Sequence, residues 1–239
     1  MTRLLVSVRN CEEALLARAA GAHLIDVKEP QRGSLGAAEA LILRSVRQCL
    51  DADVPLSAAL GELVNDVMPR DHSVLDGYSY AKLGLAGCRG LDDWPRRWAA
   101  ELRSFPGGVC AVAVAYADFQ AARSPDPDDV IRVGCDLGCR ALLFDTHDKT
   151  RGSLFDHLSV QEVARLSERA RAAGMMVVLA GSLGRDAFDD AISLRPDYLA
   201  IRGDACRGGR LGMLDRTRVE RWIERLAGVR QRATADPVT

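Results

Sequence analysis

The chain has 239 residues, 48% of them hydrophobic, and its 32 basic residues nearly balance its 33 acidic ones. A balanced charge gives no reason to expect binding to nucleic acid or to an anionic membrane. The N-terminal apolar run is too short for a secretory signal, and the longest apolar stretch, residues 109–117, is too short to span a bilayer. We therefore expect a soluble, cytoplasmic protein with one sizeable core and with no nucleic-acid or membrane partner.

Short apolar runs of strand length recur along the chain, and amphipathic segments lie between several of them. The runs are continuously apolar rather than alternating, which is typical of parallel strands covered on both faces. The predicted strands, in chain order, are residues 4–8, 24–28, 55–60, 80–85, 109–116, 140–146, 175–182 and 198–203. The predicted helices are residues 11–20, 37–50, 91–104 and 159–174, the last with Ser159 as its N-cap and Gly174 just after its end.

Eight strands that alternate with helices in a chain of this length favour a single (β/α)8 barrel, the TIM-barrel fold. An open doubly wound sheet is the alternative, and it is disfavoured because no GxGxxG motif follows the first strand. No low-complexity linker divides the chain. We expect one catalytic domain over residues 1–228 and a flexible C-terminal tail over residues 229–239.

The seven cysteines form an odd set that is scattered along the chain without any CxxC pair. Cys135 and Cys139 are the closest pair, and no second pair at metal-ligand spacing follows them. We interpret the cysteines as reduced, mostly buried thiols, and we expect no metal site.

One phrase occurs twice, as DVKEPQRGSLG at residues 26–36 and as DTHDKTRGSLF at residues 145–155. Asp145 follows Asp26 by 119 residues, which is half of the 239-residue chain. Duplication of a half-barrel would produce this offset and would place the second and sixth strands opposite each other. A local coincidence is the alternative, and the remaining parts of the two halves do not decide between them.

Lysine is rare in this chain, which has 29 arginines and only three lysines, Lys28, Lys82 and Lys149. Each lysine lies at or just after the end of a predicted strand, where a (β/α)8 barrel carries its active site. Arginine cannot lose its proton in a protein, whereas a buried lysine can become a neutral nucleophile. This placement favours catalysis or phosphate contact over lysines that only extend their charged ends to solvent.

Two aspartates accompany the three lysines. Asp26 and Lys28 are two residues apart and share a strand face, so the carboxylate could move protons for reactions of the amine. An ion pair between them that only fills the barrel interior is the alternative. Lys82 could lower the pKa of a neighbouring amine or act as a general base, and Asp145 and Lys149 follow the sixth strand.

Two loops have the composition of anion sites. Gly181 and Ser182 follow the seventh strand, and Arg202 and Gly203 follow the eighth. Loops at these positions often bind phosphate through backbone N–H groups and a helix N-terminus, so we predict one or two phosphorylated carbonyl substrates. Further candidates at strand ends or in these loops are Ser7, Arg9, Arg32, Ser34, Glu62, Tyr116, Asp118, His147, Arg151, Ser153, Gly184, Asp204, Arg207 and Gly208.

Six motifs occur in the order DVKEPxxGSLG, YAKLGL, AYAD, LFDTxxKxxxSLFDH, LAGSL and IRGDAC, and together they resemble the (5-formylfuran-3-yl)methyl phosphate synthase family of methanofuran biosynthesis. The resemblance covers about residues 3–206. It implies a lysine-dependent barrel, without cofactor or metal, that joins two molecules of glyceraldehyde 3-phosphate into a phosphorylated furan aldehyde. One phosphate and two waters are lost in that reaction, which classes the enzyme as a carbon–oxygen lyase.

The resemblance also implies roles for single residues. Lys28 matches the family's Schiff-base lysine, and Lys82 matches its proton-accepting lysine. Asp26, Asp145 and Lys149 match its other polar positions in the active site. The sequence departs from the family in the THDK stretch after the sixth strand and in its short, arginine-rich C-terminal end.

Two other functions would use the same residues. An aldolase or isomerase of another sugar phosphate would form the Lys28 imine without closing a ring. A non-catalytic sensor of a phosphorylated metabolite would use Lys28 only to bind phosphate. Borohydride trapping separates the enzymes from the sensor, and product absorbance separates a furan synthase from an aldolase. The sequence leaves the oligomeric state open and is compatible with a homo-oligomer.

Overall fold

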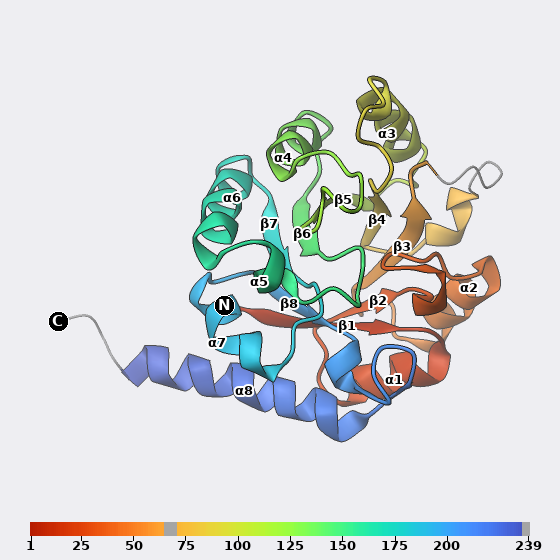
Figure 1. The fold of residues 1–239 in the computed structure, drawn as a ribbon. Helices are drawn as coiled ribbons and strands as arrows, with labels where there is room; N and C mark the ends of the chain where they lie inside the picture. The colour runs from red at the N-terminus through yellow and green to blue at the C-terminus, as the bar shows by residue number, and fades with distance from the viewer. Residues whose placement is uncertain (65–70, 236–239) are drawn as a thin grey trace.

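The fold is a closed barrel of eight parallel strands, which confirms the predicted (β/α)8 architecture. The computed structural model describes residues 1–64 and 71–235, with side chains up to residue 229. Consecutive strands pair with each other, and the eighth closes the barrel by pairing with the first (Figure 1). The strands are β1 (Arg3–Val8), β2 (Leu24–Val27), β3 (Leu56–Glu62), β4 (Tyr80–Gly84), β5 (Cys110–Tyr116), β6 (Ala141–Asp145), β7 (Met176–Leu179) and β8 (Tyr198–Ile201).

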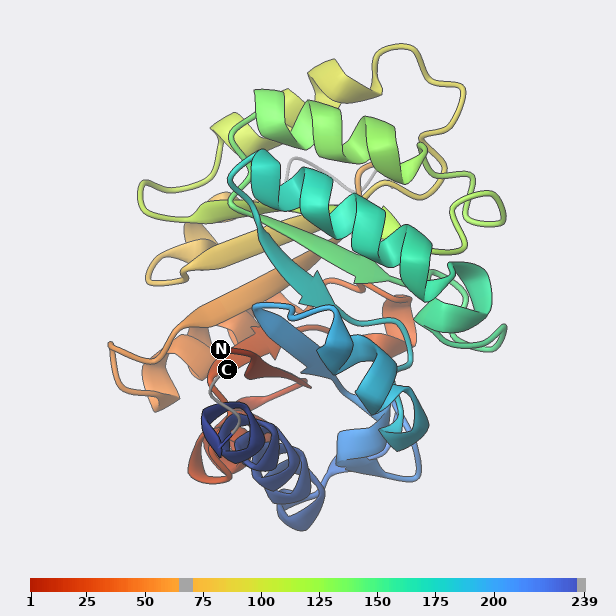
Figure 2. The same cartoon turned by 90° about the vertical axis from the view of Figure 1, so that its left-hand side faces the viewer.

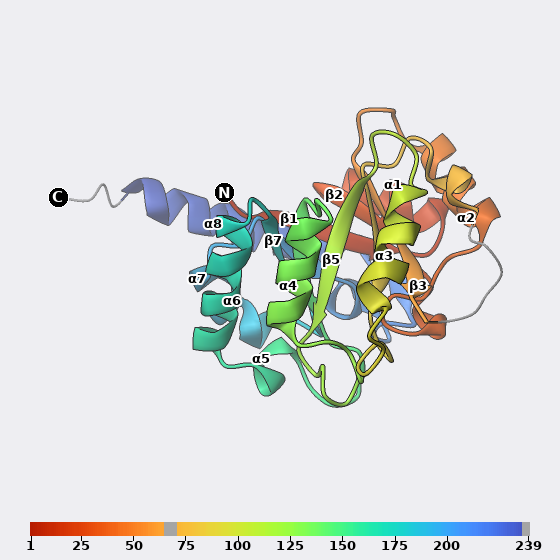
Figure 3. The ribbon, with the colours of Figure 1, turned by 90° about the horizontal axis from the view of Figure 1, so that it is seen from above.

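Helices cover the outside of the barrel (Figures 1 and 3). The α-helices are α1 (Cys11–Ala19), α2 (Ala40–Cys49), α3 (Trp94–Arg103), α4 (Pro127–Asp136), α5 (Leu154–His157), α6 (Val160–Ala172), α7 (Phe188–Ser193) and α8 (Arg216–Ala235). The 3-10 helices are η1 (Pro30–Arg32), η2 (His72–Leu75), η3 (Arg185–Ala187) and η4 (Gly203–Ala205), and a hairpin of β9 (Cys206–Arg207) and β10 (Met213–Leu214) follows β8. The helices α4 and α6 lie side by side across the strands (Figure 2).

Local sequence signals account for the ends of α6. The Ser159 side chain accepts a hydrogen bond from the backbone N–H of Glu162 at 3.2 Å, which satisfies one of the free donors at the start of the helix. At the other end Gly174 has a φ of 76°, a conformation that glycine adopts without steric cost. Both predicted ends of this helix are confirmed.

Alternation of side chains along the strands places a polar layer above an apolar one inside the barrel. On β1, Leu5 packs with the other apolar side chains of the interior, and Ser7 lies two residues nearer the C-terminal end. Ser7 is in register with Asp26 on β2, which is in register with Ser57 on β3. Lys82 on β4 reaches this layer and donates a hydrogen bond to Ser57. The register therefore assembles a polar layer just below the C-terminal ends of the strands.

The two repeated phrases lie at opposite sides of the barrel and share two local features. They begin in β2 and β6, which are four strands apart in the eight-stranded barrel. Gly33 and Gly152 have φ angles of 108° and 111°, which side-chain-bearing residues rarely adopt. Leu35 and Leu154, which lie two positions after these glycines, are both buried. This correspondence favours duplication of a half-barrel over coincidence.

The cysteines differ from the prediction of reduced thiols at one pair. A disulfide joins Cys11 at the start of α1 to Cys49 at the end of α2, and their Cα atoms lie 6.2 Å apart. The pairing was missed because 38 residues separate the two cysteines and only the packing of α1 against α2 brings them together. The free cysteines that the structure describes are Cys88, Cys139 and Cys206, which are buried, Cys110, which is half-buried, and Cys135, which is exposed.

The last helix extends into the segment that the sequence predicted to be a flexible tail. Helix α8 continues past Ala227 to Ala235, and residues 236–239 lie outside the described part of the chain. Among the described residues no helix is both long and apolar enough to cross a membrane. Within the same residues no group of three or more His, Cys, Asp and Glu side chains is arranged to hold a metal ion.

Candidate active site

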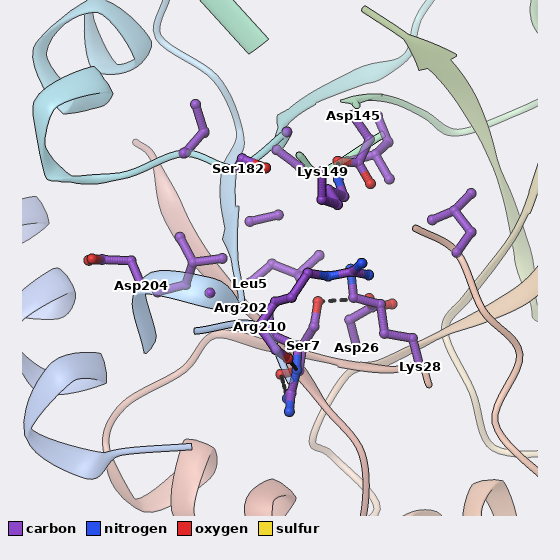
Figure 4. A pocket seen from close by; sticks show the side chains of 18 of the residues that line it. Leu5, Ser7, Asp26, Lys28, Asp145, Lys149, Ser182, Arg202, Asp204 and Arg210 are labelled. Carbon is purple, nitrogen blue, oxygen red and sulfur yellow. Dashed lines mark hydrogen bonds and ion pairs between the residues drawn. The ribbon is translucent and has the colours of Figure 1, made fainter. Parts of the chain in front are cut away.

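A cavity of about 390 Å³ opens at the C-terminal ends of the strands, and it contains all three lysines of the chain (Figure 4). Residues from β1, β2, β4 and β6 form its floor and walls, and the loops after β7 and β8 form its rim. Its polar lining consists of Ser7, Asp26, Lys28, Lys82, Asp145, Lys149, Ser182, Arg202, Asp204 and Arg210, with backbone from Gly181, Gly184 and Gly203. All five predicted catalytic residues therefore meet in one place.

An ion pair between Lys82 and Asp26 lies at the bottom of the cavity. The Lys82 ammonium contacts one carboxylate oxygen of Asp26 and donates to the Ser57 hydroxyl at 2.9 Å. The Ser7 hydroxyl donates to the other oxygen of Asp26 at 3.1 Å. Both partners of the ion pair are no more than 3% exposed. Asp26 therefore pairs with Lys82, and the ion pair with Lys28 that the sequence left as an alternative is wrong.

A second ion pair joins Lys149 to Asp145 on the opposite wall. Lys149 also donates to the Thr146 hydroxyl at 3.2 Å, and the Ser34 hydroxyl lies 2.8 Å from both Asp145 Oδ2 and the Thr146 carbonyl oxygen. Burial raises the pKa of Asp145, but the charges of Lys149 and Lys28 and the hydrogen bonds outweigh this and hold it below its ordinary value. The serine of the first repeated phrase thus fixes the aspartate of the second.

Lys28 lies between these two ion pairs without a carboxylate partner of its own. Among the described residues, no Asp or Glu forms an ion pair with its ammonium group, whereas Lys82 and Lys149 each have one. Burial and the charges of Lys149 and Lys82 lower the pKa of Lys28 to about 8, although Asp145 and Asp26 oppose the shift. Lys28 is half-buried in the cavity wall, and an amine with this pKa is partly neutral near physiological pH and can attack a carbonyl carbon.

The lowered pKa predicts how the reactivity of Lys28 depends on pH. The neutral amine is the nucleophile, so the rate of imine formation with a small aldehyde should rise with pH and level off above an inflection near 8. Borohydride trapping of the adduct after short incubations at a series of pH values measures this rate. A rate that keeps rising to pH 10.5, the ordinary lysine value, would show that Lys28 is not perturbed. Circular dichroism at each pH would control for unfolding.

The loops after β7 and β8 present a row of free backbone donors to the cavity. Within the described chain, the N–H groups from Gly181 to Gly184 have no hydrogen-bond partner, nor has that of Gly203. Gly181 and Ser182 have positive φ angles of 86° and 53°, and successive free N–H groups in a turn can bind an anion. These donors are therefore the candidates for the phosphate site that the sequence predicts after β7.

Arg202, which the sequence predicted to contact phosphate, is already fully bonded within the protein. Its five N–H donors contact the Glu13 carboxylate twice and the carbonyl oxygens of Ser7, Arg210 and Gly212. Arg202 and Glu13 are only 4% and 8% exposed. No donor is left over for a ligand, so the structure places Arg202 beneath the site as a support and not as a phosphate contact.

Several other predicted residues lie outside the cavity lining. Both carboxylate oxygens of Asp118 accept backbone N–H groups of the loop after β6, from His147 at 2.7 Å and from Asp148 at 2.8 Å. This bonding explains Asp118 as a residue that shapes the loop. Glu62 does not line the cavity, and its carboxylate accepts a hydrogen bond of 2.6 Å from the Tyr116 hydroxyl. The remaining polar side chains of the RGSL phrases have partners outside the cavity. Arg32 pairs with Glu39, Arg151 pairs with Asp148, and Ser153 bonds to Asp156.

Arg210 lines the cavity and was missed by the sequence analysis. It follows the turn of Gly208 and Gly209, and its guanidinium donates to the Gly33 carbonyl at 2.9 Å. The sequence analysis favoured Arg202 because it lies directly at the strand end. The signal for Arg210 was the RGGR stretch, in which two glycines permit a tight turn before the arginine.

Comparison with known proteins gives consistent matches over nearly the whole chain. A family model described as 4-HFC-P synthase matches residues 4–223. The (5-formylfuran-3-yl)methyl phosphate synthase of Methanopyrus kandleri is 36% identical over 214 residues, which cover 87% of this chain and 90% of that protein. The enzyme of the same name from Methanobrevibacter smithii is 32% identical over 215 residues, 86% of this chain and 90% of that protein.

Solved structures with the same fold are more distant in sequence. Phosphoribosyl anthranilate isomerase from Thermus thermophilus superposes with a TM-score of 0.64 at 18% identity, over 95% of this chain and 100% of that chain. The isomerase of the same name from Thermotoga maritima has a TM-score of 0.64 at 13% identity, with the same coverage of both chains. At these identities the likeness supports the barrel fold alone.

Proposed function

Because the chain belongs to the 4-HFC-P synthase family, we propose that it is a (5-formylfuran-3-yl)methyl phosphate synthase. It would join two molecules of glyceraldehyde 3-phosphate, releasing one phosphate and two waters, in the cytoplasmic synthesis of methanofuran. The observation that carries this proposal is the amine of Lys28, which has no ion-pair partner among the described residues and shares one cavity with two lysine–aspartate pairs and a row of free backbone donors. An enzyme that builds an imine on a phosphorylated aldehyde needs both features.

The first step is imine formation. The neutral amine of Lys28 attacks the aldehyde carbon of one substrate, and water leaves as the carbon–nitrogen double bond forms. Protonation of the imine makes the hydrogen on the adjacent carbon acidic, since the nitrogen can accept the electron pair. The imine supplies the electron sink in this reaction, and we therefore propose that the chemistry needs no metal or cofactor.

The next steps require proton transfer on both sides of Lys28. A base removes the proton from the carbon next to the imine, and the resulting enamine attacks the aldehyde carbon of the second substrate. Lys82 with Asp26 and Lys149 with Asp145 are the candidates, because the two pairs line the same cavity as Lys28. Ring closure, loss of one phosphate and loss of two waters then lead to the aromatic furan, and hydrolysis of the imine consumes the water that its formation released, which frees the aldehyde and regenerates the lysine.

Product analysis tests this proposal. Purified protein is incubated with glyceraldehyde 3-phosphate while ultraviolet absorbance and free phosphate are followed. We expect a conjugated aldehyde to appear together with one phosphate for every two substrate molecules consumed. An imine without new absorbance would instead indicate an aldolase or isomerase, and binding without an imine would indicate a sensor.

A further inference from the structure

The cations of the cavity differ in whether the protein neutralises them. Five cationic side chains line the cavity, namely the three lysines, Arg202 and Arg210. Lys82 pairs with Asp26, Lys149 with Asp145, and Arg202 with Glu13. The one other carboxylate in the lining, Asp204, accepts a hydrogen bond from Trp222 at 2.7 Å. Among the described residues, Lys28 and Arg210 are therefore the two cavity cations without a carboxylate partner.

Arg210 is held at the mouth of the cavity by bonds at both ends of the residue. Its carbonyl oxygen accepts a hydrogen bond from Arg202 Nε at 2.8 Å, and Arg202 is itself fixed by the buried carboxylate of Glu13. Its guanidinium donates to the carbonyl of Gly33 in the loop after β2, at 2.9 Å. Arg210 thus connects the loop after β8 to the loop that follows Lys28, and it faces Lys149 and Asp145 across the cavity (Figure 4).

No ion pair with a described residue neutralises the charge of Arg210. Burial lowers the pKa of Arg210, and Asp145 opposes this shift without forming an ion pair with it. One donor of the guanidinium is bonded to Gly33, and the others have no hydrogen bond to the described residues. A guanidinium with free donors at the edge of a cavity matches the geometry of a phosphoryl group, which can accept two parallel hydrogen bonds.

We propose that Arg210 binds the phosphoryl group of the substrate that forms the imine with Lys28, as a second oxyanion site separate from the backbone donors of the loop after β7. The inference rests on the proposed function, because a reaction between two phosphorylated aldehydes places two phosphoryl groups in one cavity. The backbone row from Gly181 to Gly184 provides for one of them. The RGSL side chains do not provide for the other, since they are bonded elsewhere.

The test compares a phosphorylated with an unphosphorylated aldehyde in the Arg210→Gln variant. Borohydride trapping at a series of aldehyde concentrations gives the half-saturating concentration for glyceraldehyde 3-phosphate and for glyceraldehyde. Loss of a charge-assisted bidentate contact should raise the value for the phosphate ester about 10- to 100-fold and leave that for glyceraldehyde within about twofold. Arg210→Lys keeps the charge but loses the bidentate guanidinium, so its half-saturating concentration for glyceraldehyde 3-phosphate should lie between those of the wild type and Arg210→Gln.

A matched control lies on the same hairpin. Arg207 precedes the glycine turn, pairs with Asp215 and is 80% exposed outside the cavity, so Arg207→Gln should leave both aldehydes unaffected. An unchanged value for glyceraldehyde 3-phosphate in Arg210→Gln overturns the proposal. An equal rise in the half-saturating concentrations of both aldehydes also overturns it, because a general disturbance of the site would then be the cause. If Arg210→Gln does not fold, the comparison is made with Arg210→Lys.

Titration with inorganic phosphate separates this inference from the proposed function. Calorimetric binding of phosphate needs no imine and no furan product. We expect Arg210→Gln to bind phosphate about tenfold more weakly, or at fewer sites, than the wild type and Arg207→Gln. If the wild type forms no furan but this difference is found, the synthase proposal fails and the anion site stands. Equal phosphate binding by all three proteins contradicts the anion site, whatever product is formed.

Discussion

Lys28→Ala is expected to lose covalent adduct formation and to lower kcat for furan formation by at least about 10³-fold. The variant removes the cavity lysine that has no ion-pair partner among the described residues, and without it no electron sink forms for carbon–carbon bond formation. Initial rates from ultraviolet absorbance measure kcat. The cavity should otherwise persist, because Lys28 contributes no ion pair to its walls.

Lys28→Arg is the matched control for charge. Arginine keeps a cation at this position but cannot become a neutral nucleophile, so this variant should be as inactive as Lys28→Ala. It should still bind glyceraldehyde 3-phosphate in a calorimetric titration. Substantial turnover by Lys28→Arg would mean that Lys28 serves only as a phosphate contact and that another group carries the chemistry.

Glu13→Ala is expected to lower the free energy of unfolding by about 3–5 kcal/mol, because it leaves the buried guanidinium of Arg202 without its carboxylate. Denaturant titration followed by circular dichroism measures this change. Glu12→Ala is the matched control, since the neighbouring side chain on α1 is exposed and its loss should change stability by no more than about 0.5 kcal/mol. A Glu13→Ala protein within 1 kcal/mol of the wild type would contradict the assigned support role of this pair.

The same pair predicts the pH dependence of this loss. Burial raises the pKa of Glu13, but the hydrogen bond and charge of Arg202 outweigh it and hold the pKa below 4.5, its ordinary value. A lowered folded-state pKa contributes stability above the unfolded-state value, and this contribution disappears as the pH falls through the folded-state value. The difference in stability between wild type and Glu13→Ala should therefore be largest near neutral pH and should shrink below about pH 4.5.

The strands of this barrel could be predicted from the sequence because each is a run of apolar residues bounded by polar ones. The helices were harder to predict. Helix α4 begins with Asp126 as its N-cap and Pro127 at its first position, but the SPDPDD stretch around them has the composition of a turn. Helix α7 has six residues, too few for a helical period to stand out. The charged end of α8 lacks a strong apolar pattern, and it was interpreted as a tail.

The sequence predicted which catalytic residues form the site but not which carboxylate pairs with which lysine. The three lysines were found because lysine is rare here and strand ends carry the active site in this fold. Which carboxylate meets which lysine depends on register around the barrel, and Asp26 pairs with Lys82 across 56 residues of sequence. Similarly, Arg202 and Arg210 occur in one loop, and only the buried carboxylate of Glu13 decides which of them faces a ligand.

Location of the covalent adduct tests the account most directly. The protein is incubated with glyceraldehyde 3-phosphate, reduced with borohydride, digested, and analysed by peptide mass spectrometry, which distinguishes the three lysines because each lies in a separate segment. We expect one reduced adduct, on Lys28. An adduct on Lys82 or Lys149 in its place, or no adduct under conditions that yield the furan product, would contradict the assignment of Lys28 as the nucleophile.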